Sequence, residues 1–254
     1  AMVLVVALVA FVIIRNNRRF TQKREEEGVD TLFRQIVRTH DKSMVWELLS
    51  THVRTTQGDV LVFTRSAFRH ISQGLMHDNM KELRAAHHEI DEQKGIWKRY
   101  RRKEILGMRK IDYMQAVEKN TWFHLGCNSI TQIIYGLKRM LEPCLEHVDN
   151  NFNPMPQAYV DEFIPICNAV DKFLEETHRL ITSGNFNGVD EVLVEGNAIK
   201  SRISQIRHEQ QDRIQRDEQN LKIDLLYLST LQETQEIISI TRHLLRASKR
   251  FQTQ

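Results

Sequence analysis

The amino-acid sequence predicts an all-helical protein that is built as two tandem three-helix bundles. Apolar residues recur every three or four positions over most of the chain, and the apolar–polar alternation typical of strands is rare. All four prolines lie between Pro143 and Pro165, so the stretches 15–142 and 166–254 permit very long helices. The chain has 254 residues, of which 41% are hydrophobic and 27% charged, so we expect a globular protein of one large or two small domains.

The first residues suggest a membrane segment. Met2–Ile14 holds thirteen uncharged apolar residues, fewer than the roughly 20 that a spanning helix needs, and Arg15 and further basic residues follow at once. A secretory signal would carry its charges before the apolar run. Since the sequence opens on Ala1, we expect residues 1–14 to be the C-terminal part of a transmembrane helix in the cell inner membrane. The basic residues then place the rest on the cytoplasmic side. A buried core helix is the alternative.

A connector and a first bundle are expected next. Residues 15–40 form a basic, amphipathic connector whose apolar side holds Leu32, Phe33, Ile36 and Val37. Residues 41–153 form the first bundle, in which Asp41 or Ser43 caps the first helix, a turn lies at 77–79, and Asp112 starts the third helix. The expected core stripe of the first helix is Val45, Leu49, Val53, Thr56, Val60, Phe63, Ala67, Ile71 and Leu75. That of the second is Leu83, Ala86, Ile90, Trp97, Tyr100 and Met108.

The third helix, to about Asn151, carries an apolar stripe and a polar line. The stripe comprises Ile130, Ile134, Leu137, Leu141, Leu145 and Val148. His124, Asn128 and Gln132 recur at a spacing of four residues beside it. We expect these polar side chains to point into the packed core or along its rim, where they would line a small polar site or form a buried hydrogen-bonded layer.

A second bundle is expected over residues 154–254. The run Asn153–Pro156 interrupts the helical pattern, because residues before prolines are pushed out of the helical region. Helices are expected at about 157–183, 189–215 and 217–250, with a turn at 184–188. The stripe of the last helix is Leu221, Leu225, Leu228, Leu231, Ile238 and Leu245.

The two bundles are expected to be repeats of one another. A shift of 104 positions lays Asn128 on Gln232 and Gln132 on Glu236, and it keeps the apolar character of the residues between them. The third helices of the two bundles therefore hold equivalent places in the prediction.

Composition and motifs exclude several classes of function. The three cysteines have no CxxC spacing, which indicates a reducing compartment and structural thiols. The formal net charge of +3 is too small to imply nucleic acid, and no GxGxxG, Walker, HExxH or GxSxG motif occurs. We therefore expect no enzyme and no nucleic-acid partner.

The strings NTWFHLG and LKRMLEP, with HVDNNFNP, resemble the cytoplasmic tail of inorganic phosphate transporters from Bacteroidetes-type bacteria. In those proteins a PhoU-like domain of two three-helix bundles follows the last transmembrane helix. The resemblance covers about residues 10–250. It implies a cytoplasmic regulatory domain that tunes phosphate uptake by docking on the membrane part of the same transporter.

The PhoU family holds clustered metal ions with an acidic motif on the third helix of each repeat. The resemblance places Asn128 and Gln132 at these positions in the first repeat, and Gln232 and Glu236 in the second, with Glu233 adjacent. Amides are poor ligands for hard cations, so a multinuclear cluster is not expected. These five residues stay candidate metal ligands, and no cofactor is assigned.

A basic segment is the remaining candidate site. Lys94–Lys110 contains eight Lys and Arg residues, and we expect a partner-facing or membrane-facing patch at Lys98, Arg99, Arg101, Arg102 and Lys103. Its partner would be the anionic inner leaflet, a phosphate-bearing ligand or the transporter's own loops. The simpler interpretation is a solvated helix face.

Two rival functions stay open. One is a metal- or ligand-binding sensor that uses the polar residues on the third helix of each bundle. The other is a structural coiled-coil spacer that promotes a homodimer, for which the sequence would need sustained heptads.

Overall fold

The computed structural model describes residues 27–216 and 221–253, and these residues form helices and connecting turns without any strand. The predicted all-helical class is confirmed. The predicted membrane segment 1–14 and the first part of the connector lie outside the described residues. Among the helices that are described, none is long and apolar enough to cross a bilayer.

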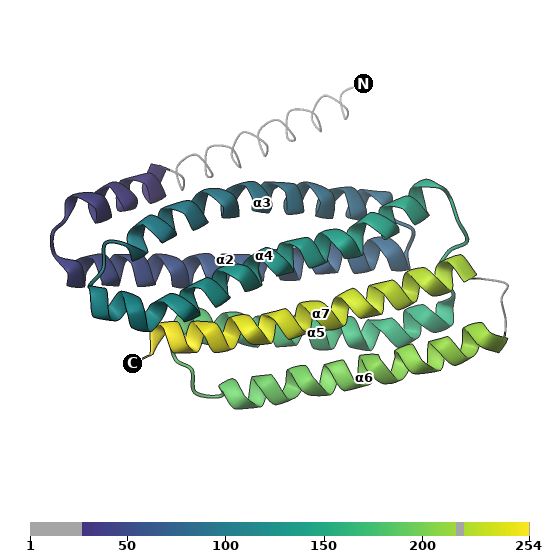
Figure 1. The fold of residues 1–254 in the computed structure, drawn as a ribbon. Coiled ribbons are helices and arrows are strands. Elements are labelled where there is room, and N and C mark those ends of the chain that lie inside the picture. Colours follow the sequence, from purple (N-terminus) through teal and green to yellow (C-terminus); the bar gives the residue numbers. More distant parts are fainter. Residues whose placement is uncertain (1–26, 217–220, 254) are drawn as a thin grey trace, which may run out of the picture.

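Six long helices follow a shorter helical segment over 27–38 (Figure 1). They are α2 (Lys42–Met76), α3 (Met80–Met108), α4 (Tyr113–Asp149), α5 (Gln157–Ser183), α6 (Val189–Arg216) and α7 (Leu221–Gln252). The predicted bounds agree with these to within a few residues.

Side-chain caps define where the first three long helices start. Asp41 accepts hydrogen bonds from the backbone N–H groups of Ser43 and Met44, and Asn79 and Asp112 cap α3 and α4 in the same way. Each cap satisfies N–H groups that have no partner within the helix. The predicted roles of Asp41 and Asp112 and the predicted turn at 77–79 are confirmed.

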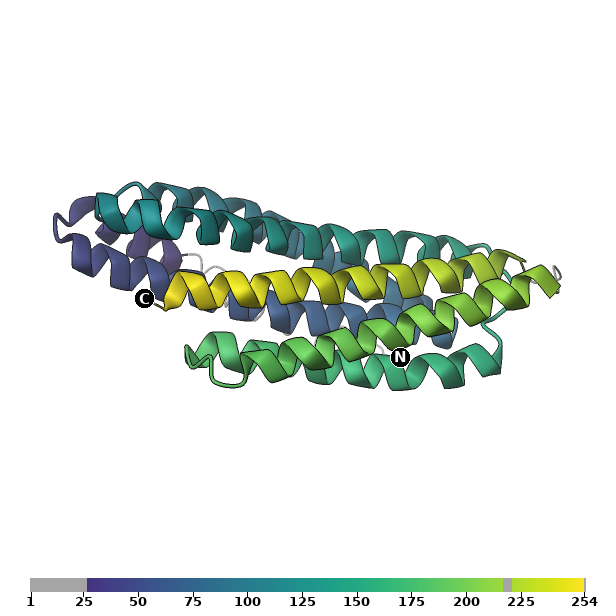
Figure 2. The same ribbon diagram turned by 60° about the horizontal axis from the view of Figure 1, so that its bottom comes forward.

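The most extensive helix–helix packing in the described chain joins α4 to α7, two helices far apart in the sequence. Next come α2 on α3 and α2 on α5. Helix α3 packs on α2 and α4, and α6 packs on α5 and α7, so these two helices lie at opposite edges of the molecule (Figures 1 and 2). Helices α2, α4, α5 and α7 therefore enclose the centre.

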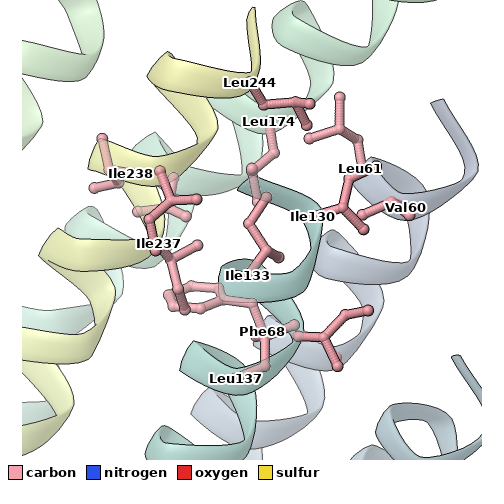
Figure 3. Close-up of a cluster of buried hydrophobic side chains, with 14 of the residues drawn as sticks. Val60, Leu61, Phe68, Ile130, Ile133, Leu137, Leu174, Ile237, Ile238 and Leu244 are labelled. Carbon is pink, nitrogen blue, oxygen red and sulfur yellow. The ribbon is translucent and has the colours of Figure 1, made fainter. Parts of the chain in front are cut away.

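One continuous hydrophobic core runs through this centre. Figure 3 shows side chains of α2, α4, α5 and α7 meeting there, among them Leu61, Ile133, Leu174 and Ile237, all fully buried. Burial of such side chains contributes about 1.5–3 kcal/mol each relative to exposure. The core thus ties residues before Pro154 to residues after it.

The predicted core stripes are largely confirmed on α2, α3 and α4. Phe63, Tyr100, Leu145 and Val148 are only partly buried, and the other members of these stripes are buried. On the helical segment 27–38, Phe33 and Ile36 are buried as expected, whereas Val37 is exposed.

The predicted stripe is wrong at the start of α7. Leu221 and Leu225 are 45% and 53% exposed, and Leu228 is only half-buried. The buried positions there belong to Ile223, Asp224, Leu226, Tyr227 and Thr230. The physical reason is that hydrogen bonds to Tyr159, Gln210 and Glu162 allow Asp224 and Tyr227 to occupy buried positions, which turns Leu221 and Leu225 outward.

Candidate functional site

The polar line of α4 is exposed. His124, Asn128 and Gln132 all face solvent, so they form no buried hydrogen-bonded layer. The core-facing positions of this part of α4 are occupied instead by Cys127, Ile130 and other apolar side chains. The expectation that the polar line points into the core is wrong, because its residues lie on the exposed face of α4.

The candidate metal ligands on α7 lie at the surface as well. Gln232 and Glu236 are exposed, and Glu233 is occupied by Arg139 of α4. The Arg139 guanidinium donates from Nε to Oε1 of Glu233 at 3.0 Å and from Nη2 to Oε2 at 2.9 Å. This two-pronged contact is the preferred geometry of an arginine–carboxylate pair.

The register of α4 on α7 separates Asn128 from Gln232. Arg139 meets Glu233, and Gly126 lies against Leu244, so the two helices are antiparallel. Asn128 and Gln232 are therefore about twelve residues apart along the pair, or roughly 18 Å at 1.5 Å per residue. Within the described ranges no three metal-binding side chains of His, Cys, Asp or Glu lie together.

The structure divides the predicted basic patch between two surfaces. Lys103 forms an ion pair with Asp30 of the helical segment 27–38. The pKa of Asp30 is lowered, first by the hydrogen bond and charge of Lys103 and to a smaller extent by Arg34 and Arg99. This side of the patch therefore holds the connector against α3.

The other side of the patch faces a groove of 340 Å³ between α3 and α4. Its charged wall consists of Lys94, Lys98, Arg101 and Arg102, all from α3. Its apolar floor and far wall consist of Trp97, Ile105, Ile134 and Tyr135, with the hydroxyl of Thr131. We call this feature the basic groove.

Hydrogen bonds fix the floor of the basic groove. The indole Nε1 of Trp97 donates to the Thr131 hydroxyl at 3.0 Å, and this hydroxyl donates to the Cys127 carbonyl at 2.9 Å. Trp97 is only 4% exposed, and the ammonium group of Lys94 lies 5.4 Å from the ring centre of Tyr135. The polar groups of the floor are thus satisfied, and the cations of the wall are the groups left to bind a ligand.

Within the described part of the chain, no carboxylate forms an ion pair with these four cations. Elsewhere the structure pairs its arginines across helices, as in Arg65 with Asp171 and Arg213 with Glu162, each at 2.8 Å. Cations that converge without a counter-charge raise the local potential and attract anions. The basic groove is therefore a candidate anion-binding surface with an apolar floor.

A buried polar cluster lies beneath the basic segment, and it was not predicted from the sequence. Glu104 is only 1% exposed, and its Oε1 atom lies 3.5 Å from Nε2 of His52 on α2. Thr56 bonds to the Glu104 carboxyl and lies 3.4 Å from His52 Nε2. A signal was present in the sequence, since Glu104 falls seven residues after Trp97 on the predicted core stripe of its helix.

Burial is the largest cause of the pKa shifts of Glu104 and His52. Desolvation raises the pKa of Glu104 to about 7, against a smaller lowering by the Thr56 hydrogen bond. Desolvation lowers the pKa of His52 to about 4, with help from the charge of Lys103. Phe33 and Tyr100 pack edge-on against the His52 ring.

A second buried network joins α5, α6 and α7. The Tyr159 hydroxyl donates to Asp224 at 2.6 Å, and the Gln210 amide donates to the same hydroxyl at 2.7 Å. Beside it, Glu162 accepts hydrogen bonds from Tyr227 at 3.0 Å and Arg213 at 2.8 Å. These hydrogen bonds link side chains of three helices, with Oε1 of Gln210 left without a partner, so the network fixes the register of the helices.

No protein-family profile matches this chain, and no curated protein matches it.

Proposed function

We propose that this chain is a PhoU-like regulatory domain of a membrane inorganic phosphate transporter. In this proposal the domain docks at the cytoplasmic face of the transporter and tunes phosphate uptake. It acts without catalysis, and the membrane part of the same protein is its main partner.

The helix contacts support the proposed division into two tandem three-helix bundles, 41–153 and 154–254. Each of α2, α3 and α4 packs on the other two, and so does each of α5, α6 and α7. The pairs α2–α5 and α4–α7 then join the bundles, with α3 and α6 at matching outer places. Such an arrangement is what a pseudo-two-fold repeat requires.

The observation that carries the docking proposal is the basic groove. Four cations of α3 converge there without a carboxylate partner among the described residues. A cytoplasmic leaflet with anionic lipid attracts each nearby Lys or Arg by about 1 kcal/mol. A domain tethered to the membrane part also meets that surface at high effective concentration. Several cations on one wall are therefore enough to favour one docked orientation.

Neither rival function gains comparable support. A sensor built on the third helices would need Asn128 near Gln232, and the α4–α7 register puts these two about twelve residues apart. Gln132 and Glu236 lie closer along the pair, but both are exposed and they supply a single carboxylate. A coiled-coil spacer would expose a long apolar seam for a second copy, whereas the four central helices bury their apolar faces against one another.

Phosphate uptake by the complete gene product that contains these residues tests the proposal. We expect uptake in cells that lack other phosphate transporters, and we expect it to decline when phosphate is plentiful. Removal of residues 41–254 should leave uptake but abolish the decline. Reversal of Arg101 and Arg102 to Glu should weaken the decline, while the matched reversal of Arg202 and Arg246 should not. Absence of phosphate uptake would contradict the proposal.

A further inference from the structure

We propose that the basic groove binds the phosphate headgroup of an anionic phospholipid. The inference deepens the proposed function and rests on one part of it, namely that the chain works beside a bilayer. It names the ligand, the groove and the side chains that hold it.

The apolar surroundings of the groove favour a lipid over a free anion or an acidic peptide. Half of the exposed large apolar side chains in the described chain lie on the α3–α4 hairpin, namely Leu106, Tyr113, Met114, Val117, Leu125 and Tyr135. Inorganic phosphate or an acidic loop would gain nothing from them. Apolar side chains beside cations on one face are typical of surfaces that lie in the membrane interface.

Three of these side chains, Tyr113, Val117 and Tyr135, lie with the cations along one seam. A second groove of 810 Å³ continues between α3 and α4 and shares Ile105 with the basic groove. Tyr113 and Val117 line it together with the basic residues Arg109 and Lys110. On α4, Tyr113, Val117 and Tyr135 lie four and then eighteen residues apart, which puts them on the same side of the helix. The seam thus offers alternating charge and apolar surface over the C-terminal half of α3.

The chemistry of the wall suits a phosphodiester. Arg101 and Arg102 carry planar guanidinium groups, which match pairs of phosphate oxygens, and Lys94 and Lys98 add mobile point charges. Trp97 and Thr131 are already hydrogen-bonded to each other. The cations therefore bind the phosphate, while Ile105 and Tyr135 contact the glycerol and the first acyl carbons.

Lysine footprinting on the full chain tests this site. Lys94 and Lys98 report on the groove, and the exposed Lys172 and Lys222 on α5 and α7 serve as internal references. The chain is mixed with vesicles and treated with an amine-acylating reagent that does not cross membranes. Labelling of each lysine is then followed by peptide mass spectrometry. Three samples are compared: phosphatidylcholine, phosphatidylcholine with about 20% phosphatidylglycerol, and phosphatidylcholine with about 10 mM inorganic phosphate.

We expect the anionic vesicles alone to slow labelling of Lys94 and Lys98, by roughly threefold or more relative to the reference lysines. About 500 mM salt should remove this protection, because the Debye length falls to about 4 Å. The double variant Arg101→Glu/Arg102→Glu should lose the protection, and Arg101→Gln/Arg102→Gln should lose part of it. The matched variant Arg202→Glu/Arg246→Glu should keep it. Circular dichroism would verify that each variant is folded.

Several results would overturn the inference. Equal protection by inorganic phosphate would mean a free-anion site, and protection in pure phosphatidylcholine would mean a contact that does not need anionic lipid. Protection without lipid that grows with protein concentration would assign the groove to a second copy of the chain. The uptake experiment is independent, since a groove that binds lipid in a protein without phosphate uptake would leave this inference standing and remove the proposed function.

Discussion

The Nε2 atom of His52 lies 3.5 Å from the Oε1 atom of Glu104 in the buried space between α2 and α3. The distance suits an ion pair, but burial lowers the pKa of His52 to about 4 and raises that of Glu104 to about 7. Between these values both side chains are uncharged, because desolvation penalises the charged form of each. The contact therefore joins two neutral groups in mildly acidic solution.

The two groups make opposite contributions to stability as pH changes. The pKa of Glu104 is higher in the folded state, so its contribution is present below the ordinary glutamate pKa of 4.5 and is lost as pH rises to about 7. The pKa of His52 is lower in the folded state, so its contribution is present above the ordinary histidine pKa of 6.5 and is lost as pH falls to about 4. Between pH 4.5 and 6.5 the fall in the free energy of unfolding due to Glu104 and the rise due to His52 cancel in the unmodified protein.

Single substitutions should reveal how each group alone makes the free energy of unfolding depend on pH. In Glu104→Gln the slope of His52 remains, so the free energy of unfolding should rise with pH between about 4 and 6.5, by up to roughly 1.4 kcal/mol per pH unit. In His52→Gln it should instead fall between about 4.5 and 7 at a similar rate. Urea denaturation at closely spaced pH values measures both. Slopes of the same sign in the two variants would contradict the assignment.

Helix bounds could be predicted from the sequence because local chemistry decides them. Asp41, Asn79 and Asp112 satisfy the free N–H groups of a first helical turn, and prolines interrupt the chain near residue 154, so these signals need no tertiary contact. The turn after α5 follows the same logic, since Gly184 adopts a φ of 67° that favours glycine.

The candidate site was harder to predict, because the polarity of a residue and of its neighbours in the sequence does not decide there whether its side chain is buried. Glu104 lies in a segment dense in Lys and Arg yet is buried, while Asn128 and Gln132 lie beside an apolar stripe yet are exposed. Tertiary partners decide these cases: Thr56 and His52 on another helix meet Glu104. The position of the basic groove depends likewise on which face of α4 packs against Trp97, and helical spacing in one sequence does not specify the facing helix.

Two mid-helix glycines should respond in opposite ways to the same substitution. A Cβ atom on Gly58 of α2 would lie 2.5 Å from Cγ2 of Thr182 on α5, whereas one on Gly95 of α3 would meet nothing nearer than Arg99 at 3.9 Å. Gly58→Ala should lower the free energy of unfolding by about 1–2 kcal/mol, because overpacking outweighs the gain in helix propensity. Gly95→Ala should raise it by roughly 0.5–1 kcal/mol.

Thr182 cannot easily make room for the added methyl group, since its hydroxyl donates to the His178 carbonyl at 2.8 Å. Gly58→Ala/Thr182→Ser removes Cγ2 and should recover most of the lost stability. Denaturant unfolding of the three variants checks these expectations. An equal gain in stability from Gly58→Ala and Gly95→Ala would show that α2 and α5 are not so closely packed at this point.

The purified protein should retain less than about one equivalent of tightly bound metal after dialysis, because amide oxygens are weak ligands for hard and borderline cations. Asn128 and Gln132 supply only amides on α4, and on α7 Glu233 is held by Arg139. The register of the two helices also keeps Asn128 and Gln232 roughly 18 Å apart. The release of Glu233 in Arg139→Ala therefore adds one carboxylate to an incomplete set and should leave the metal content unchanged. Elemental analysis of both proteins gives the answer, and two or more equivalents of iron or zinc in the unmodified protein would favour the sensor over the regulator.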